Sequence, residues 1–347
     1  MFKLNSVRKI LIINLKYIGD VLLCTPVVEA LKSELKDVSV AMLVKEGTEA
    51  VLYNNPYLDG IFVINSQWRW GRQFRLIRML RSWNFDMAID LTDGDRSAVL
   101  AILCGADYRI GFNHEQRWRG ALYHRIVTTN RDKVHAVNYF LEAVKAVGCN
   151  VHHADPHVYP SLVDRYVVDQ LIQEKGLSTN MPFVVLHPGA RWWFKSWPVE
   201  RFIDLAKRIQ KELGFSVVVV GGSNDVETAD KIVSQCGQWA ISVAGQITLL
   251  QLAALIKQAL LFVGNDAGPM HIAAAVQTPV VGLFGPTDPH VWGPWGAVHG
   301  VIWKQVDCAP CWKHDCQRGD LNCMRQISID EVWESVNKVL KKKSINV

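Results

Sequence analysis

The chain has 347 residues, of which 49% are hydrophobic and 20% are charged, and its formal net charge is +5. This length predicts two domains of ordinary size, and the composition is typical of a globular protein whose core needs no disulfide or metal. No run reaches about 18 uncharged apolar residues, which excludes an apolar membrane-spanning helix. Asn14 and Lys16 interrupt the apolar run near the N-terminus, so a secretory signal is not indicated and a cytoplasmic protein is expected. The modest basic excess favours an acidic partner.

In the first half of the chain, apolar runs alternate with helix-like segments. The expected strands cover residues 9–15, 38–44, 60–64 and 85–91, and the expected helices cover 20–35, 68–83, 96–104 and 135–148. Asp20 is a candidate cap for the first of these helices, which Pro26 interrupts early. Strands that alternate with helices indicate parallel βαβ units with helices on both faces of a sheet.

The pattern lapses between residues 149 and 161, a helical segment is expected over 162–175, and a second alternating series follows from residue 183. Its expected strands cover 183–186, 216–220, 240–243, 259–263 and 279–284, its helices cover 198–213, a segment ending at 236, and 248–258, and a last helix covers 327–341. We therefore divide the chain into a first domain of residues 1–160, a linker region of 161–182 and a second domain of 183–326. Both halves are expected to be α/β, doubly wound and Rossmann-like, facing each other across a cleft with ligands at the carboxyl ends of the strands.

The most informative segment is residues 262–289, FVGNDAGPMHIAAAVQTPVVGLFGPTDP. A strand stops at the run Gly264-Asn265-Asp266-Ala267-Gly268, and Pro269 stands where a first helical residue is favoured. The helix N-terminus would offer free N–H groups and the positive end of its dipole to an anion such as a diphosphate. His271 would lie in the first turn of that helix. An ordinary βαβ turn is the alternative, because Gly-rich turns of this kind are common.

Two further loops of the second half also follow expected strands. Arg191 and Lys195 come after His187-Pro188-Gly189-Ala190, and two cations at the head of a helix suit a diphosphate, with a solvated basic loop as the alternative. In the run 221–225, GGSND, the glycines allow close approach of a ligand, and Asp225 could bind ribose hydroxyls or cap its own helix. The chain lacks G-x-G-x-x-G after the first strand and lacks G-x-x-x-x-G-K-[ST], which disfavours a dinucleotide oxidoreductase and a P-loop NTPase.

In the first half, one acidic residue and a basic segment stand out. Asp20 follows the first strand, where a carboxylate could accept a proton from an attacking hydroxyl, with a plain helix cap as the alternative. Residues 68–83 hold five arginines and no acid, and Arg75, Arg78 and Arg81 share one side of the expected helix. This basic amphipathic helix could contact anionic lipid headgroups or a phosphorylated acceptor, or it could simply pack its apolar side, which includes Met79, on the sheet.

A second group of arginines, which includes Arg117 and Arg119, lies in the same half. Two basic groups in one domain favour a polyanionic partner. Nucleic acid is not favoured, because no nucleic-acid motif is present.

Eight cysteines are present, and four are bunched at Cys308, Cys311, Cys316 and Cys323 with the spacing C-x2-C-x4-C-x6-C. Four thiolates can close a tetrahedral shell around a metal, but only the C-x2-C half has common metal-site spacing. Reduced structural thiols, a metal site and a disulfide are the three alternatives.

Three motifs occur in order along the chain. They are IGDVL at 18–22, HPGA at 187–190 followed by Lys195 and Trp197-Pro198, and NDAGPMH at 265–271 followed by FGPTDP at 284–289. Together they resemble the lipopolysaccharide heptosyltransferases of glycosyltransferase family 9, and the inner-core heptosyltransferase III type most of all. The combination is specific and spans most of the chain, although each motif alone is weak.

The resemblance implies a two-domain GT-B fold in which the first half takes the acceptor and the second half takes ADP-heptose. It implies an inverting displacement without a metal ion or other cofactor, in which Asp20 is the general base. In such folds the last helix, here 327–341, often packs back onto the first domain. Together with the patterns above, the expected donor-binding residues are Gly189, Ala190, Arg191, Lys195, Asp225, Asp266, Ala267, Gly268 and His271. Contact with the acceptor or a membrane is assigned to Arg75, Arg78, Arg81, Arg117 and Arg119.

The chain departs from the family pattern at Gly189 and Ala190, where many members have hydroxyl residues, and at Ala267, where some have Thr or Ser. The alternatives are acceptor choice of the heptosyltransferase I or II type, another donor sugar, a GT-B sugar-nucleotide epimerase, and a non-catalytic glycolipid binder. The expected partners are a nucleotide-sugar donor and a phosphorylated lipopolysaccharide core, met at the cytoplasmic face of the inner membrane.

Overall fold

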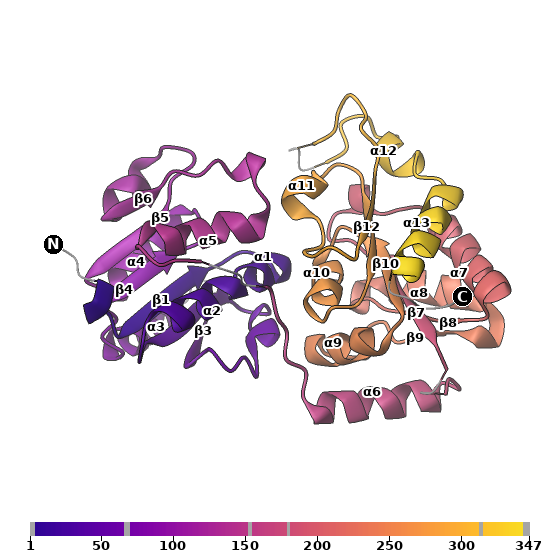
Figure 1. Cartoon of the computed structure of the whole chain (residues 1–347), viewed down its shortest axis with the longest axis horizontal. Coiled ribbons are helices and arrows are strands. Elements are labelled where there is room, and N and C mark those ends of the chain that lie inside the picture. The colour runs from indigo at the N-terminus through magenta and orange to yellow at the C-terminus, as the bar shows by residue number, and fades with distance from the viewer. Residues whose placement is uncertain (1–3, 66–69, 152–154, 179–180, 312–314, 343–347) are drawn as a thin grey trace. The chain divides into compact units, whose positions relative to one another are not determined.

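The computed structural model describes residues 4–65, 70–151, 155–178, 181–311 and 315–342. The chain divides into one unit of Met1–Tyr159 and another of Pro160–Val347, each built on its own sheet (Figure 1). This division falls next to the predicted end of the first domain.

The first unit is a parallel sheet of six strands in the order β3-β2-β1-β4-β5-β6, covered by helices. Leu11 in β1 lies opposite Ala41 of β2 and Ala88 of β4, so β1 is central and its apolar run is buried on both faces. The strands are β1 (Lys9–Asn14), β2 (Ser39–Lys45), β3 (Gly60–Ile64), β4 (Met87–Asp90), β5 (Tyr108–Phe112) and β6 (Arg125–Val127). The helices are α1 (Ile18–Leu23), α2 (Thr25–Glu34), α3 (Trp70–Ser82), α4 (Asp95–Leu103) and α5 (Ala136–Ala146), with short 3-10 turns that include η3 (Trp118–Leu122).

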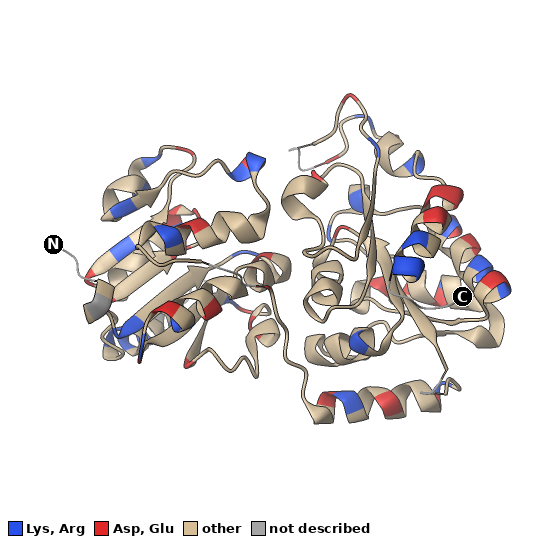
Figure 2. Cartoon of the chain, viewed as in Figure 1, with Lys and Arg blue, Asp and Glu red and all other residues tan. Residues whose placement is uncertain are grey.

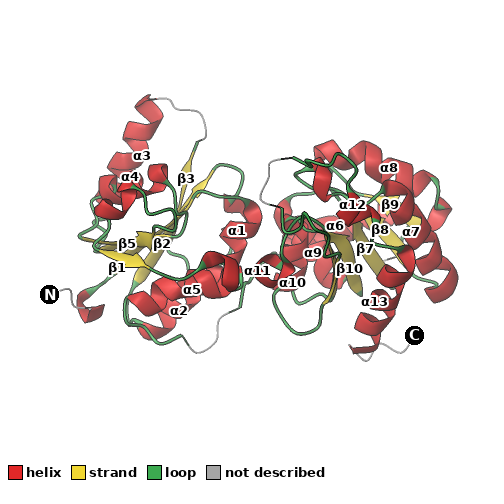
Figure 3. Ribbon diagram, turned by 90° about the horizontal axis from the view of Figure 1, so that it is seen from above, coloured by secondary structure: helices red, strands yellow, loops and turns green. Residues whose placement is uncertain are grey.

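The second unit repeats this architecture, with a parallel sheet in the order β12-β11-β10-β7-β8-β9. The strands are β7 (Phe183–His187), β8 (Ser216–Val219), β9 (Ala240–Ser242), β10 (Leu261–Asn265), β11 (Val280–Phe284) and β12 (Gly300–Trp303). The helices are α6 (Leu162–Glu174), α7 (Val199–Leu213), α8 (Val226–Ser234), α9 (Leu249–Gln258), α10 (Gly268–Ala275), α11 (Pro289–Trp292), α12 (Asn322–Arg325) and α13 (Ile329–Lys342), and η5 (Trp193–Lys195) precedes α7. Figure 3 shows helices flanking the strands of each unit.

Both sheets have a point at which the strand order reverses. In the first unit it lies between β1 and β4, and in the second unit it lies between β7 and β10. The loops that leave two such strands at their carboxyl ends diverge, which leaves a crevice where ligands bind in this class of sheet. Of the predicted site residues, Asp20 follows β1 at the first point and Asp266 follows β10 at the second.

Most of the predicted strands and helices are confirmed, with three differences. The expected helix of 20–35 is two helices, α1 and α2, because Pro26 occupies the first turn of the second one. Tyr17 is the N-cap of α1, so Asp20 lies inside its first turn and is not the cap. The strands β5, β6 and β12 were not expected, since each is short and only partly apolar.

Two segments outside the predicted second domain of 183–326 belong to the second unit. In the linker region of 161–182 the expected helical segment is confirmed as α6, which packs against α9. The last helix, α13, was expected to pack back onto the first domain. It instead buries Val332, Trp333 and Val336 in the core of the second unit, against β11, β12 and α7. Ser328 caps it, since the backbone N–H of Glu331 donates to Ser328 Oγ.

Candidate functional site

At the switch point of the second unit, the side chain of Asn265 ties three segments together. Asn265 ends β10 and is fully buried. Its Nδ2 donates to the carbonyl oxygens of Pro188 at 2.7 Å and Gly189 at 3.3 Å, and its Oδ1 accepts from the backbone N–H of Trp197 at 3.0 Å. Because a buried amide is costly unless it is paired, these bonds fix the loop after β7 and the segment before α7 against the end of β10.

The next residue, Asp266, pairs with Lys195 beside the start of α10. Lys195 Nζ lies 2.6 Å from Asp266 Oδ2, and the two side chains are 22% and 8% exposed. The N-cap of α10 is Ala267, which offers no capping oxygen, and Gly268 and Pro269 begin the helix. An uncapped helix N-terminus next to an ammonium group is an arrangement that suits a phosphate.

Asp225 lies against the loop that follows β7. Its Oδ2 accepts the backbone N–H of Gly222 at 2.8 Å. A Cβ atom at Gly189 would stand 2.5 Å from Asp225 Oδ1, and one at Gly221 would stand 2.5 Å from Asp225 Cβ. Glycine at positions 189 and 221 is therefore what allows the carboxylate to reach this edge of the sheet. The structure brings together Asp225 and Gly189, two of the residues predicted to bind the donor.

His187 ends β7 beneath this edge. Burial lowers the pKa of its imidazole to about 4, against the opposing effect of Asp225, so the ring is neutral at pH 7. Its Nδ1 is buried without a hydrogen-bond partner among the described residues. Position 264, opposite His187 in the sheet, must be glycine, because a Cβ there would stand 2.9 Å from the His187 carbonyl oxygen.

The other predicted donor residues differ in accessibility. Ala190 is half-buried at the end of the same loop, and His271 is buried in the first turn of α10. Arg191 is exposed, with its guanidinium over the ring of Trp192 at 5.6 Å. The structure thus groups Gly189, Lys195 and Asp266, with Asp225 beside them, whereas Arg191 lies at the outer surface of the loop.

At the switch point of the first unit, Asp20 stands in the first turn of α1. The residue is half-buried, and burial raises the pKa of its carboxyl while Lys16 and Arg131 lower it. Burial also lowers the pKa of Lys16, and the charge of Arg131 lowers it further. A carboxylate with a raised pKa is a better proton acceptor near neutral pH than an ordinary aspartate.

Asn14, at the end of β1, supports this turn from below. It is fully buried, its Oδ1 accepts the backbone N–H of Lys16 at 3.1 Å, and its Nδ2 donates to the Asp20 carbonyl oxygen at 3.3 Å. Neither Asn14 nor Asn265 was predicted to organise a loop. The signal that could have found them is a single amide side chain closing an otherwise apolar strand, a place where a buried polar group needs partners.

Beside this turn, three carboxylates form an ion-pair network around the buried Arg119, and of the three only Asp93 is nearly buried. The Arg119 side chain is 1% exposed and forms ion pairs with Asp93 at 2.8 Å, Asp95 at 3.1 Å and Glu115 at 3.2 Å. The expectation that Arg119 meets an acceptor or a membrane is therefore corrected, because three carboxylates already surround its guanidinium. Arg117 is half-exposed and pairs with Asp95 and Glu115 at the edge of the same network.

A buried acid closes β4 as well. The Tyr123 hydroxyl donates to Asp90 Oδ2 at 2.6 Å, and burial raises the pKa of both groups.

The basic helix of the first half is α3, and residues 66–69, with Trp68 and Arg69, lie outside the described residues. Arg75, Arg78 and Arg81 are exposed, as expected, but the Nε of Arg81 donates to the carbonyl oxygen of Leu103 at 3.0 Å. Met79 was expected on the buried side and is instead 48% exposed.

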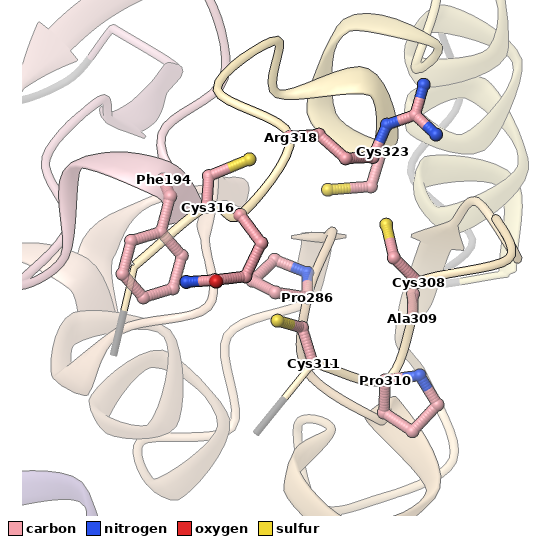
Figure 4. Close-up of a pocket in the computed structure, with 10 residues that line it drawn as sticks. Phe194, Pro286, Cys308, Ala309, Pro310, Cys311, Cys316, Arg318 and Cys323 are labelled. Atoms are coloured by element: carbon pink, nitrogen blue, oxygen red, sulfur yellow. The ribbon is translucent and has the colours of Figure 1, made fainter. Parts of the chain in front are cut away.

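The four bunched cysteines line one pocket of about 440 Å³ together with Phe194 and Pro286 (Figure 4). All four are free thiols, and their sulfur atoms point toward the interior of the pocket. Within the described part of the chain, no group of three or more His, Cys, Asp or Glu side chains is arranged to hold a metal ion. No disulfide joins any of these four cysteines, all of which the structure describes.

Comparison with known proteins gives consistent results. Residues 73–321 match the model of glycosyltransferase family 9 (heptosyltransferase). The chain is 31% identical to lipopolysaccharide heptosyltransferase 3 of Escherichia coli over 293 residues, which cover 81% of this chain and 83% of that protein.

Among solved structures, a glycosyl transferase family 9 protein from Veillonella parvula has a TM-score of 0.88 at 24% identity, covering 96% of this chain and 98% of that one. The E. coli heptosyltransferase WaaC with ADP-2-deoxy-2-fluoro heptose has a TM-score of 0.73 at 17% identity, covering 95% and 99%. These likenesses confirm the predicted α/β fold of the GT-B type. In the described helices, no stretch is both long and apolar enough to cross a membrane.

Proposed function

Because the chain belongs to glycosyltransferase family 9, the family of the heptosyltransferases, we propose that it moves L-glycero-D-manno-heptose from ADP-heptose to a heptose of the lipopolysaccharide inner core. The chain is a glycosyltransferase by family, and the donor, the acceptor and the roles of single residues are the proposal. The observation that carries it is the Lys195–Asp266 pair beside the uncapped start of α10, at the switch point of the second sheet.

In the proposed reaction, an acceptor hydroxyl oxygen attacks the anomeric carbon of the donor heptose. A new C–O bond forms as the bond from the anomeric carbon to the β-phosphate oxygen breaks, and ADP leaves with the electron pair of that bond. Asp20 takes the proton of the attacking hydroxyl. Its pKa is raised by burial, so it holds a proton more readily than an ordinary aspartate. Attack opposite the leaving group inverts the anomeric configuration.

The donor diphosphate is proposed to bind at the start of α10. The backbone N–H groups of Gly268 and its neighbours and the ammonium of Lys195 would meet the charge that develops on the leaving ADP. Asp266 holds Lys195 in position by their 2.6 Å contact. The remaining donor contacts are assigned to Gly189, Ala190, Arg191, Asp225, Ala267 and His271. We propose that these fixed positive groups replace the metal ion that other transferases use, and that the reaction needs no cofactor.

The proposed acceptor is the phosphorylated inner core of lipopolysaccharide. Support comes from the name of the E. coli relative, lipopolysaccharide heptosyltransferase 3, which is 31% identical to this chain. The donor assignment draws support from WaaC, whose structure was solved with an ADP-heptose analogue. Since lipopolysaccharide is anchored by a lipid, we place the protein at the cytoplasmic face of the inner membrane.

The experiment that tests this proposal combines the purified protein, ADP-heptose and a panel of truncated core acceptors, with products identified by mass and linkage. We expect one added heptose on an acceptor that already carries inner-core heptose, and the same rate after treatment with a chelator. Conversion of ADP-heptose to an epimer without acceptor would identify an epimerase instead. Binding of donor and core without any turnover would identify a non-catalytic binder.

A further inference from the structure

The first unit carries an apolar groove between α3 and α4 that the proposed chemistry does not use. It has a volume of about 760 Å³, and we call it the α3–α4 groove. Its apolar lining comes from Phe74, Ile77, Val99, Leu100, Leu103 and Trp118. Figure 3 shows the two helices side by side. The groove is therefore bounded by three elements of one unit, α3, α4 and η3.

Large aromatic side chains at this groove are exposed to an unusual degree. Phe74 is 73% exposed and Trp118 is 56% exposed, on two different elements that line the same groove. Scattered exposed apolar residues are normal on a protein surface, but apolar residues gathered around a hollow mark a surface that is covered by something else.

The charge around the α3–α4 groove indicates what covers it. α3 contains Arg72, Arg75, Arg78 and Arg81 and no acidic residue (Figure 2). The first three are exposed and form no ion pair among the described residues. The one acid that lines the groove, Asp95, is held by Arg117 at 3.0 Å and Arg119 at 3.1 Å, so its charge is compensated. The surface therefore combines exposed apolar groups with uncompensated positive charge.

A second helix with exposed apolar residues shows why the charge matters. In α6, Leu162, Val163 and Tyr166 are all more than half exposed. The helix LVDRYVVDQLIQE, however, holds three acids and one arginine. An anionic surface would attract α3 and repel α6, although both present apolar side chains.

We propose that the α3–α4 groove is the surface by which this protein docks on an anionic lipid bilayer. Phe74 and Trp118 enter the boundary between headgroups and acyl chains, and Arg72, Arg75 and Arg78 bind the lipid phosphates. The inference rests on the proposed function in one respect, since an enzyme that acts on a lipid-anchored acceptor must work at such a surface. Docking would raise the local concentration of that acceptor without any contribution to the chemical step.

Flotation with vesicles tests the docking itself. We compare vesicles of phosphatidylcholine alone with vesicles that contain roughly one third phosphatidylglycerol, at low and high salt. The native protein should bind the anionic vesicles and lose binding as salt rises. The variant Arg72→Gln/Arg75→Gln/Arg78→Gln should bind about 100-fold more weakly, at roughly a factor of five per arginine. Phe74→Ser/Trp118→Ser should also lose binding, whereas the control Leu162→Ser/Tyr166→Ser on α6 should not.

Transfer assays with two forms of one acceptor separate docking from sugar recognition. Both groove variants should keep the native kcat/KM on a deacylated, water-soluble core and lose most of it on the same core carried in vesicles. Absence of vesicle binding by the native protein overturns the proposal, and so does an equal loss in the α6 control. A fall in kcat/KM on the water-soluble core would show that α3 binds the core sugar or its phosphates. Vesicle binding without transfer to either acceptor would leave the docking surface standing and refute the proposed function.

Discussion

The two units have the same strand order, and each has its own switch point, but different side chains lie at the two points. At the ends of β1 and β4, the first unit gathers acids, with Asp20 half-buried and Asp90 fully buried. At the ends of β7 and β10, the second unit has a buried amide, Asn265, and a Lys195–Asp266 pair beside a helix N-terminus. The fold thus gives each unit a crevice at its switch point, and the side chains there determine the chemistry of that crevice.

The difference shows how one fold can provide two halves of a transfer reaction. Burial raises the pKa of Asp20 and so favours a group that takes a proton. The second unit keeps small residues, Gly189 and Ala267, where the proposed diphosphate would approach backbone N–H groups closely. Asn14 and Asn265 have the same task in both, which is to lock the loop after the strand.

Asp20→Asn removes the proposed base of the first unit and should have the largest effect on the rate. Loss of the general base should lower kcat by at least about 100-fold while ADP binding, measured by calorimetry, is retained. In the native enzyme the rate should fall as pH drops through the raised pKa of Asp20, because protonation removes the base. This acid limb should be absent from the residual rate of the variant. A native rate in Asp20→Asn would remove the residue from the proposed mechanism.

The same variant should not lose stability. Because the folded pKa of Asp20 is raised, the folded state favours the protonated form, and that contribution is present below the unfolded pKa and lost as pH rises through the folded value. At pH 7 a neutral Asn should therefore leave the melting temperature unchanged or raise it. The matched control is Asp37→Asn, an exposed residue in the left-handed region that Asn tolerates, which should change neither rate nor stability.

Arg119→Met tests whether the arginines of the first unit are structural. Its removal leaves the nearly buried Asp93 without its partner, which should cost about 2 kcal/mol, or roughly 30-fold in the unfolding equilibrium. The half-exposed Arg117→Met should cost less than about 0.5 kcal/mol. Urea unfolding monitored by tryptophan fluorescence measures both. Equal stabilities for the two variants would contradict the structural assignment of Arg119.

Sequence patterns could predict the fold because buried parallel strands read as apolar runs, as in β1 and β10. They also singled out Lys195 and Asp266, which form an ion pair in the structure, because each lies in a loop between a strand and a helix. Anion binding at this pair stays a prediction. Sequence patterns could not distinguish Arg119 from Arg75. Both are arginines in a basic half, and only tertiary contacts with Asp93, Asp95 and Glu115 make the first one a buried ion-pair centre. Short edge strands such as β6 are not predicted from the sequence for the same reason, because strand pairing, and not amino-acid composition, defines them.

Lys195→Met tests the anion site of the second unit. The loss of one charge-assisted contact to a phosphate should lower kcat/KM for the donor about 20-fold. Steady-state kinetics with varied ADP-heptose measures the effect. Lys231→Met is the matched control, because Lys231 pairs with Glu200 on an exposed surface, and it should leave the kinetics unchanged. A native kcat/KM in Lys195→Met would contradict the assignment of this residue to the donor.

The smallest expected effect concerns the contact between Gly189 and Asp225. In Gly189→Ala the new Cβ would meet the Asp225 carboxylate at 2.5 Å, so the carboxylate must rotate away, and donor affinity should fall about fivefold. Asp225→Ala should cost a similar factor by removing the same carboxylate. If both act through that one group, the double variant should be no worse than Asp225→Ala alone, because the added methyl then has room. Additive losses in ADP affinity across this cycle would mean that Gly189 acts on the donor through its backbone and that the carboxylate acts separately.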